Sequence, residues 1–521
     1  MIVEARDPDL RPLVMADSES HSSGGSENGD PGSIPVHGEA EIRGALERSR
    51  TAQREWASLS ARDRARAMSR LGDVLGSQRD RIVARIVEET GKPVTEALAE
   101  IVVSADLIRH YVRVAPRALA PRRVGTGWML WKSARVERAP FGVVAVITPW
   151  NYPLLLAMDA VTAALFAGNG VLLKPSELTT RTGLLIGDLC ASAGLPEGLI
   201  QVVTGGRETG ALLVQSGVDK VFFTGSSTTG RAVMRSAAER LTPVSLELGG
   251  KDPAIVLADA DLERAARGIV FGAFFNAGQT CVSIERVLVE RPAYDAFVSR
   301  VVELVGEFRQ GGDGEFDLGP MTSGAQLDVV DRQVEDARAR GARVVTGGRR
   351  TSDGRGYEPT VLLDVDSTME VMTDESFGPI LPIVPVADEE EAVRIANESA
   401  FGLQASVWTR DRKSAERIAS RLRSGGVSIN DSLSHYGVPG LPMGGTGASG
   451  FGSRRGVEGL LDMTRPRNIL RDRLGLKREP WWFPYSPGTR RLSQALLDWR
   501  STGDLHGLLR GARRMMRNKD E

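Results

Sequence analysis

The sequence has little of what several common enzyme mechanisms need. Its 521 residues contain two cysteines, too few for a disulfide framework, so we expect a reducing, cytoplasmic compartment. Five histidines are present, and none has a spacing to another histidine or to a cysteine that would hold a metal ion. A cysteine–histidine couple of the protease type has weak support, because only His110 and His435 lie away from the two ends of the chain.

Long apolar runs and an excess of one charge are also missing. The most apolar stretch, residues 157–173, is interrupted by Asp159 and by glycines, so it predicts a buried helix followed by a strand rather than a membrane span. The chain opens on acidic and polar residues, so no signal peptide is expected. A formal net charge of −1 provides no general attraction to nucleic acid.

What the chain does contain is an alternation of helical segments with short runs of β-branched residues. This alternation begins near FGVVAVITPWNYP and a second series runs from about residue 250 to 450. Strands that alternate with helices predict an α/β fold with mostly parallel sheets covered on both faces. Residues 1–35 are polar and rich in glycine, so they predict a disordered leader.

Residues 481–521 predict a basic, amphipathic C-terminal tail. We favour packing of this tail on its own protein or on a sister subunit, and contact with a membrane surface is the alternative. The predicted apolar faces comprise Leu492, Ala495, Leu496 and Trp499 in a first helix and Leu505, Leu508, Leu509 and Ala512 in a second.

Two stretches contain candidate reactive groups. FFNAGQTC, residues 274–281, ends in Cys281, whereas Cys190 lies in LCASAG and is expected to be a core residue. In LELGGK, residues 246–251, Glu247 follows an apolar strand. Desolvation there would raise its pKa toward the range of a general base; the alternative is a structural pair with Lys251 or an arginine.

Three turns between strands and helices are candidates for binding. In PWNYP, residues 149–153, two prolines stiffen the turn and Asn151 could donate to an oxyanion, although a purely structural turn is an alternative. KPSE, residues 174–177, and FTGSSTTG, residues 223–230, each follow a strand, where open α/β sheets bind ligands and helix N-termini bind phosphate.

Taken together and in this order, these motifs resemble the aldehyde dehydrogenase superfamily. The match comprises PWNYP, GNGVLLKPSE, FTGSSTTG, LELGGKDP, FFNAGQTC, ESFGP and PMGGTGASGFG and covers about residues 36–480. The resemblance implies two Rossmann-like open α/β domains and a β-strand oligomerisation arm. The implied boundaries are residues 36–123 and 141–248 for the cofactor-binding domain, 249–447 for the catalytic domain, and 124–140 and 463–480 for the oligomerisation strands.

The resemblance also implies a mechanism and a set of site residues. Cys281 would attack the aldehyde carbon, Asn151 and the Cys281 N–H would hold the oxyanion, and a hydride would pass to NAD or NADP to leave a thioester. Glu247 would then activate water. An acidic Glu177 favours NAD over NADP. The implied cofactor-binding residues are Trp150, Lys174, Ser176, Glu177, Gly225, Ser226, Leu248, Glu375 and Phe377.

The substrate and the assembly follow less directly. CVSIER is similar to a subgroup labelled succinate-semialdehyde dehydrogenase, in which an arginine often stands six positions before the nucleophile. Here that residue is Phe275, so we expect an aliphatic or aromatic aldehyde, with succinate semialdehyde as the alternative. Glu247 disfavours a CoA-acylating enzyme, and the complete set of reactive groups disfavours a catalytically silent member.

An exposed hairpin with Trp128 and Trp131 would invite aggregation, so a homodimer or homotetramer is expected.

Overall fold

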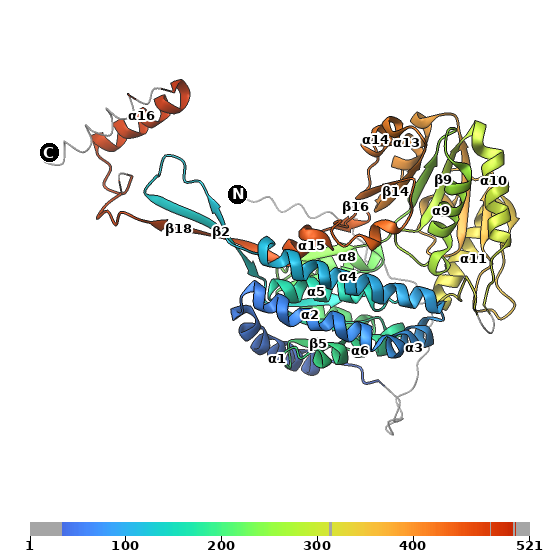
Figure 1. Cartoon of the computed structure of the whole chain (residues 1–521), viewed down its shortest axis with the longest axis horizontal. Helices are drawn as coiled ribbons and strands as arrows, with labels where there is room; N and C mark the ends of the chain where they lie inside the picture. Colours follow the sequence, from blue (N-terminus) through green and yellow to red (C-terminus); the bar gives the residue numbers. More distant parts are fainter. Residues whose placement is uncertain (1–33, 312–314, 480, 504–505, 507–521) are drawn as a thin grey trace, which may run out of the picture.

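The computed structural model describes residues 34–311, 315–479, 481–503 and 506. They form two α/β halves and a projecting arm (Figure 1). The predicted leader lies outside the described residues, except for residues 34–35, and so does the predicted second tail helix. Within the described residues, no helix is long and apolar enough to span a bilayer.

Four helices form an N-terminal layer against the first half. They are amphipathic, and apolar side chains such as Met68, Leu71 and Leu75 are completely buried between them. Ser60 caps the second helix by accepting a hydrogen bond from the N–H of Asp63. The helices are α1 Glu39–Ser58, α2 Ala61–Ser77, α3 Arg79–Thr90 and α4 Val94–Ala118.

The first half is built on a six-stranded sheet in the order β17-β7-β6-β3-β4-β5. Its strands are parallel except β17, which pairs antiparallel with β7. The strands are β3 Val143–Ile147, β4 Gly170–Lys174, β5 Ile200–Val202, β6 Lys220–Thr224, β7 Val244–Glu247 and β17 Gly450–Phe451. The associated helices are α5 Leu155–Ala167, α6 Thr180–Ser192, α7 Arg207–Gln215 and α8 Ser227–Ala238.

The second half contains a seven-stranded sheet in the order β10-β11-β12-β9-β8-β14-β15, with only β10 antiparallel to its neighbour among these described strands. Its strands are β8 Asp252–Val256, β9 Ile284–Glu290, β10 Arg343–Thr346, β11 Thr360–Leu363, β12 Ile380–Val386, β14 Gln404–Trp408 and β15 Gly426–Ile429. Its main helices are α9 Leu262–Phe274, α10 Arg291–Gly306, α11 Gly324–Ala339, α13 Glu389–Asn397 and α14 Arg412–Ala419.

The predicted α/β class with mostly parallel sheets is confirmed. Residues 157–173, expected to be a buried helix followed by a strand, form most of α5 and β4, and every residue of both is buried. Cys190 lies in the core of the first half, as expected.

The arm is a three-stranded antiparallel sheet that projects from the first half (Figure 1). β2 and β18 pair along their full lengths, from Pro140 opposite Thr464 to Lys132 opposite Asp472. The hairpin with Trp128 and Trp131, expected to be exposed, thus has β18 of the same chain as a partner strand, and both rings pack against Trp481. Pairing of the arm with another subunit stays a prediction. The arm strands are β1 Arg122–Val124, β2 Lys132–Pro140 and β18 Thr464–Asp472, and they are followed by α16 Pro487–Thr502.

Short elements complete the described fold. They are η1 Glu177–Thr179, η2 Phe275–Gly278, α12 Glu370–Thr373, η3 Ser434–Gly437, α15 Gly456–Asp462, and the pair β13 Phe401–Gly402 and β16 Thr446–Gly447.

Candidate active site

A cleft opens where the parallel strands of the first sheet end. β3, β6 and β7 are neighbours, so the turns that follow their carboxyl ends meet at one edge of the sheet. A cavity of about 260 Å³ lies there. Its lining residues include Trp150, Asn151, Gly225, Ser226, Glu247, Leu248, Cys281, Glu375 and Phe377. The structure therefore brings nine of the twelve predicted site residues to one cleft.

A second cavity, of about 230 Å³, adjoins the first and is mostly apolar. Cys281 and Leu156 line both cavities, so the candidate nucleophile lies where they meet. Phe275 forms part of the wall: its ring lies 5.0 Å from that of Phe271 and 6.3 Å from that of Tyr152, between ring centres. Further apolar lining residues are Ala99, Val103, Leu155, Val282 and Leu433.

Asn151 is held rigidly beside Cys281. Its Nδ2 donates to the carbonyl of Gln279 over 2.9 Å, and Asn276 Nδ2 donates to the Asn151 carbonyl over 3.1 Å. The turn before the cysteine has left-handed backbone at Asn276 (φ 56°) and Gly278 (φ 71°). A side chain at Gly278 would collide with the Gly378 carbonyl, 2.2 Å from its Cβ, so this turn requires glycine. One Nδ2 hydrogen of Asn151 remains for a substrate oxygen.

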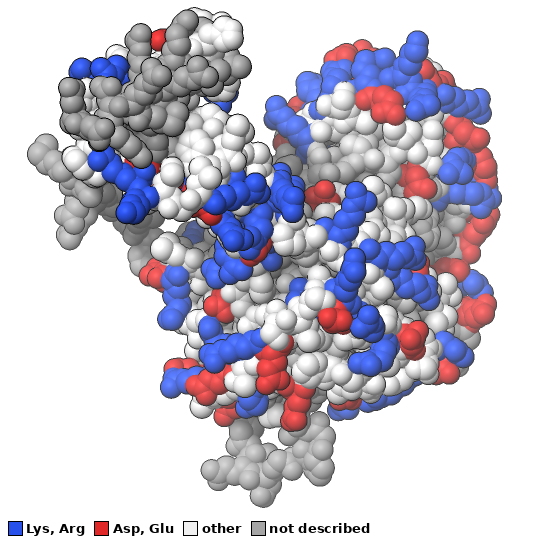
Figure 2. Space-filling model, turned by 60° about the vertical axis from the view of Figure 1, so that its left-hand side comes forward, with Lys and Arg blue, Asp and Glu red and all other residues white. Residues whose placement is uncertain are grey.

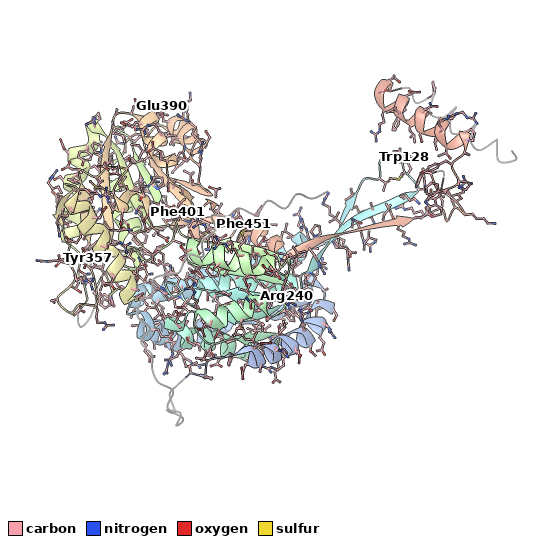
Figure 3. The ribbon with its side chains drawn as sticks, turned by 180° about the vertical axis from the view of Figure 1, so that it is seen from behind. Trp128, Arg240, Tyr357, Glu390, Phe401 and Phe451 are labelled. Carbon is pink, nitrogen blue, oxygen red and sulfur yellow. The ribbon has the colours of Figure 1, made fainter. Side chains whose placement is uncertain are left out.

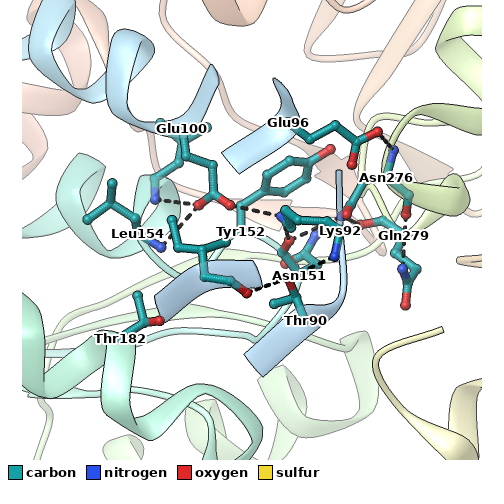
Figure 4. Close-up of polar contacts among 12 residues, drawn as sticks. Thr90, Lys92, Glu96, Glu100, Asn151, Tyr152, Leu154, Thr182, Asn276 and Gln279 are labelled. Carbon is teal, nitrogen blue, oxygen red and sulfur yellow. Dashed lines mark hydrogen bonds and ion pairs between the residues drawn. The ribbon is translucent and has the colours of Figure 1, made fainter. Parts of the chain in front are cut away.

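A buried ion pair supports this turn (Figure 4). Lys92 Nζ donates to the Asn151 carbonyl over 2.7 Å and to Glu100 over 2.8 Å. The other oxygen of Glu100 accepts hydrogen bonds from the N–H groups of Leu154 and Leu155, at the start of α5. Sequence analysis missed this group, because nothing in TGKP indicates that the lysine is buried against a glutamate eight residues later.

We expect Lys92→Met to lower the free energy of unfolding by about 3–5 kcal/mol, because it leaves the Glu100 carboxylate buried without its cation. The matched control is Arg81→Met. Arg81 pairs with Asp188 at the same 2.8 Å, but both side chains are more than half exposed, so a loss below about 1 kcal/mol is expected. Denaturant unfolding would measure both, and equal losses would contradict the structural role given to Lys92.

Glu247 ends β7 in an apolar setting. The carboxyl is almost completely buried, and its Oε1 has no hydrogen-bond partner among the described residues. Burial raises the pKa of Glu247 to about 8, although the positive charge of Arg454, 3.9 Å away, opposes the rise. Of the two alternative pairings, the one with Lys251 is absent, since Lys251 Nζ lies 2.7 Å from Glu285 instead, whereas the one with an arginine is present as a long ion pair with Arg454. A buried carboxyl with this pKa and one oxygen free of hydrogen bonds to the described residues suits a general base near neutral pH.

Cys281 and Arg454 complete the local electrostatics. Burial raises the pKa of the Cys281 thiol to about 12, so the thiol is neutral before it reacts and must lose its proton in the reaction. Arg454 lies close enough to lower the pKa values of both Cys281 and Glu247. Sequence analysis missed Arg454; its place directly after GASGFGS was the available signal, but its burial was not visible there.

The segment ESFGP is fixed to LELGGK by hydrogen bonds. The N–H of Gly250 donates to Glu375 over 3.0 Å. Glu285 accepts from the N–H groups of Ser376 and Phe377 over 2.8 and 2.9 Å. The rings of Phe377 and Trp150 meet edge to face, 5.4 Å apart between centres. Burial, and then the charge of Glu285, raises the pKa of Glu375 to about 8. Two motifs far apart in the sequence therefore form one wall of the cleft.

Three predicted cofactor residues lie outside both cavities. Lys174 ends β4 and is buried, with Nζ 3.8 Å from a carboxylate oxygen of the exposed Glu177. Ser176 caps the following turn by accepting from the N–H of Leu178 over 3.2 Å. Because β4 is the neighbour of β3, these residues lie at the same edge of the sheet as the cleft.

A family model described as the aldehyde dehydrogenase family matches residues 26–469. The chain belongs to the aldehyde dehydrogenase family. It is 45% identical over 471 residues to a 4,4'-diapolycopene aldehyde oxidase of Methylomonas, covering 90% of this chain and 88% of the relative. It is 38% identical to a putative succinate-semialdehyde dehydrogenase [NADP(+)] of Mycolicibacterium smegmatis, covering 88% of this chain and 92% of the relative.

Solved structures confirm the aldehyde dehydrogenase-like fold. An NAD-dependent aldehyde dehydrogenase from Sinorhizobium meliloti matches with a TM-score of 0.83 and 34% identity, over 86% of this chain and 89% of that one. Betaine aldehyde dehydrogenase from Staphylococcus aureus in complex with NAD+ matches with a TM-score of 0.82 and 30% identity, over 86% and 90%. The protein is thus an NAD(P)-dependent oxidoreductase that oxidises a small aldehyde.

The cleft of this aldehyde dehydrogenase fits a dinucleotide. Gly225 lets the backbone turn tightly, since an added Cβ would lie 2.6 Å from the ring of Phe223. The N-terminus of α8 follows at Ser227, where the N–H of Thr229 donates to the Ser226 hydroxyl, and the positive end of the helix favours phosphate oxygens. A Cβ at Gly249 would lie 2.3 Å from the Glu375 carboxylate, so only glycine fits at this position in the wall of the cleft. Among the described residues, no cluster of His, Cys, Asp and Glu could hold a metal ion.

Proposed function

We propose that this aldehyde dehydrogenase oxidises an apolar aldehyde to the carboxylic acid through a thiohemiacetal and a thioester on Cys281. The position of Cys281 where the apolar cavity meets the cofactor cleft carries this proposal. A carbonyl carbon bound in the apolar cavity would reach the sulfur without leaving that cavity.

In the first step, the Cys281 thiol loses its proton to solvent water, its sulfur forms a bond to the carbonyl carbon, and the carbonyl π electrons move to oxygen. Asn151 Nδ2 and the N–H of Cys281 stabilise the resulting oxyanion, and one such donor is typically worth about 10²–10³ in rate. Bound NAD(P)+ supplies the acceptor for the hydride that leaves this carbon. Glu247 then takes a proton from water, whose oxygen attacks the thioester carbon, and the bond from that carbon to sulfur breaks. The leaving Cys281 sulfur takes the proton back from Glu247, which restores the neutral thiol.

For the cofactor, we propose that Trp150, Gly225, Ser226, Leu248, Glu375 and Phe377 hold the dinucleotide in the cleft. Lys174, Ser176 and Glu177 would bind the adenosine ribose at the adjoining strand end. The exposed carboxylate of Glu177 would accept a hydrogen bond from a free 2′-hydroxyl and repel a 2′-phosphate, so NAD is favoured over NADP.

The lining of the apolar cavity supports an aliphatic or aromatic aldehyde. None of its described lining residues is lysine or arginine, so the cavity offers no cation to pair with the carboxylate of an anionic substrate. The Methylomonas relative is named for the aldehyde of 4,4'-diapolycopene, in keeping with an apolar substrate. Succinate semialdehyde, named in the mycobacterial relatives, is the second candidate, and Phe275 argues against it.

We expect kcat/KM for a medium-chain aliphatic aldehyde to exceed that for succinate semialdehyde by about 10²-fold or more, and Phe275→Arg to narrow this ratio by at least about tenfold. The arginine removes part of the apolar wall and adds a cation for the carboxylate. Phe275→Leu keeps the wall apolar and should keep the preference. Reduced cofactor absorbance measures all rates, and a wild-type preference for succinate semialdehyde would contradict the proposal.

The remaining expectations are proposals of the same kind. We propose the domain boundaries given above, a homodimer or homotetramer, and a cytoplasmic location, which the two free cysteines support. Water as the final acceptor is preferred to CoA, because Glu247 is buried beside the reactive thiol.

A further inference from the structure

The outer end of the arm exposes an unusual number of aromatic side chains. We call residues 481–485, WWFPY, the aromatic loop. Its Trp482, Phe483 and Tyr485 are 51%, 78% and 68% exposed. The loop lies far from both α/β halves, beside α16 and the turn that carries Trp128 (Figure 3). Several exposed aromatic side chains next to one another indicate a binding surface, whereas single exposed apolar residues are common on any protein.

The base of the aromatic loop is anchored to the arm. Trp481 packs against Trp128 and Trp131, with ring centres 5.3 and 5.9 Å apart. Just before it, the buried Glu479 pairs with Lys132 and accepts a hydrogen bond from Trp131 Nε1. The exposed rings are therefore presented outward from a fixed base, which limits the conformational entropy that binding would cost.

Basic side chains flank the aromatic loop on both sides. Lys477 and Arg478 precede it, and Arg490 and Arg491 follow it on α16; all four are exposed. The last 51 residues contain 12 Lys and Arg against 6 Asp and Glu, a net charge of +6 in a chain whose total is −1. Figure 2 shows basic side chains beside uncharged surface on the projecting part of the molecule at the upper left.

The apolar face of α16 does not account for the exposed rings. The helix α16 lies beside the outer end of the arm (Figure 1). The residues of its predicted apolar face are only half-buried; they are Leu492, Ala495, Leu496 and Trp499. No residue of α16 is fully buried, so the packing expected for the tail on its own protein or on a sister subunit stays a prediction. The aromatic loop is uncovered in the single chain.

We propose that the aromatic loop and its flanking basic residues dock this enzyme on an anionic lipid bilayer. Tryptophan and tyrosine favour the boundary between head groups and acyl chains, and phenylalanine can enter the acyl region. Lysine and arginine beside them pair with anionic head groups. The inference does not rest on the proposed reaction, although a bilayer would also concentrate an apolar aldehyde near its cavity.

The test is flotation of the full-length enzyme with vesicles of phosphatidylcholine alone or mixed with phosphatidylglycerol. Binding to the anionic vesicles is expected, with weaker binding at high salt and to the neutral vesicles. The double variant Trp482→Ser/Phe483→Ser, and separately Arg490→Glu/Arg491→Glu, should each weaken binding at least about tenfold. Turnover of a water-soluble aldehyde should not change, because these residues are remote from the cleft.

Matched controls are Leu241→Ser, at a side chain that is 89% exposed on the first half, and Arg62→Glu/Arg66→Glu on α2. Both should bind vesicles like the wild type. No flotation of the wild type with anionic vesicles would overturn the proposal. So would a Trp482→Ser/Phe483→Ser enzyme that floats normally but shows a smaller mass by light scattering, because the aromatic loop would then be a contact between subunits.

Discussion

Cys281→Ser is expected to abolish aldehyde oxidation, with kcat lower by at least about 10³-fold. Serine has nearly the same size, so the lining of both cavities is kept. Its hydroxyl is a far weaker nucleophile than a thiol whose proton can be removed, and no thioester could form. The measurement is the absorbance of reduced cofactor, together with the intact mass of enzyme trapped with aldehyde and NAD+, which should show an acyl adduct only in the wild type.

Cys190→Ala provides the matched control for this loss. Cys190 is buried in the core of the first half, and burial raises the pKa of its thiol to about 12. Its replacement should lower stability modestly and leave kcat within about twofold of the wild type. Retained turnover in the Cys281 variant, or an acyl adduct mapped to Cys190, would contradict the role given to Cys281.

Glu247→Gln is expected to separate the two halves of the reaction. One equivalent of reduced cofactor per active site should form in a burst, because attack by Cys281 and loss of hydride do not need the water base. Turnover should then stop at the thioester, with a steady-state rate lower by about 10²–10⁴-fold. Rapid mixing would follow the burst, and intact mass would identify the acyl-enzyme.

The pH dependence of thioester hydrolysis tests the same residue. Only the ionised carboxylate can accept a proton, and the pKa of Glu247 is raised to about 8. The wild-type hydrolysis rate should therefore increase about tenfold per pH unit below pH 8 and level off above pH 8. The rate of the glutamine variant should not show this increase. Glu239→Gln, at an exposed glutamate after α8, should behave like the wild type. A steady-state rate near that of the wild type in Glu247→Gln would remove Glu247 from the mechanism.

The sequence predicted the features that depend on local pattern. The composition of residues 157–173 alone predicts a helix followed by a strand. Their complete burial agrees with the lack of charged residues other than Asp159. Cys281, Glu247 and Asn151 could be singled out because each follows a strand or a turn of distinctive residues. The convergence of Asn151 and Glu247 on one cleft follows from the parallel order of β3, β6 and β7, whereas Cys281 reaches the cleft from the second half, between η2 and β9.

Features that depend on long-range pairing could not be predicted. Lys92 and Glu100 look like ordinary helix residues, and only the fold buries them under the turn that carries Asn151. Arg454 is 207 positions from Glu247 in the chain, yet it moderates the pKa of that carboxyl. The KPSE motif is a different case. The sequence predicted its residues Lys174, Ser176 and Glu177 as cofactor-binding, but in the structure they lie beside the cleft rather than in its lining.

The junction at Cys281 has a consequence for how the two reactants enter. The apolar cavity and the cofactor cleft have only Cys281 and Leu156 in common among their described lining residues, so the hydrocarbon chain of the proposed substrate would occupy a different space from the dinucleotide. If each space has its own opening to solvent, the substrate and the cofactor would be able to bind in either order.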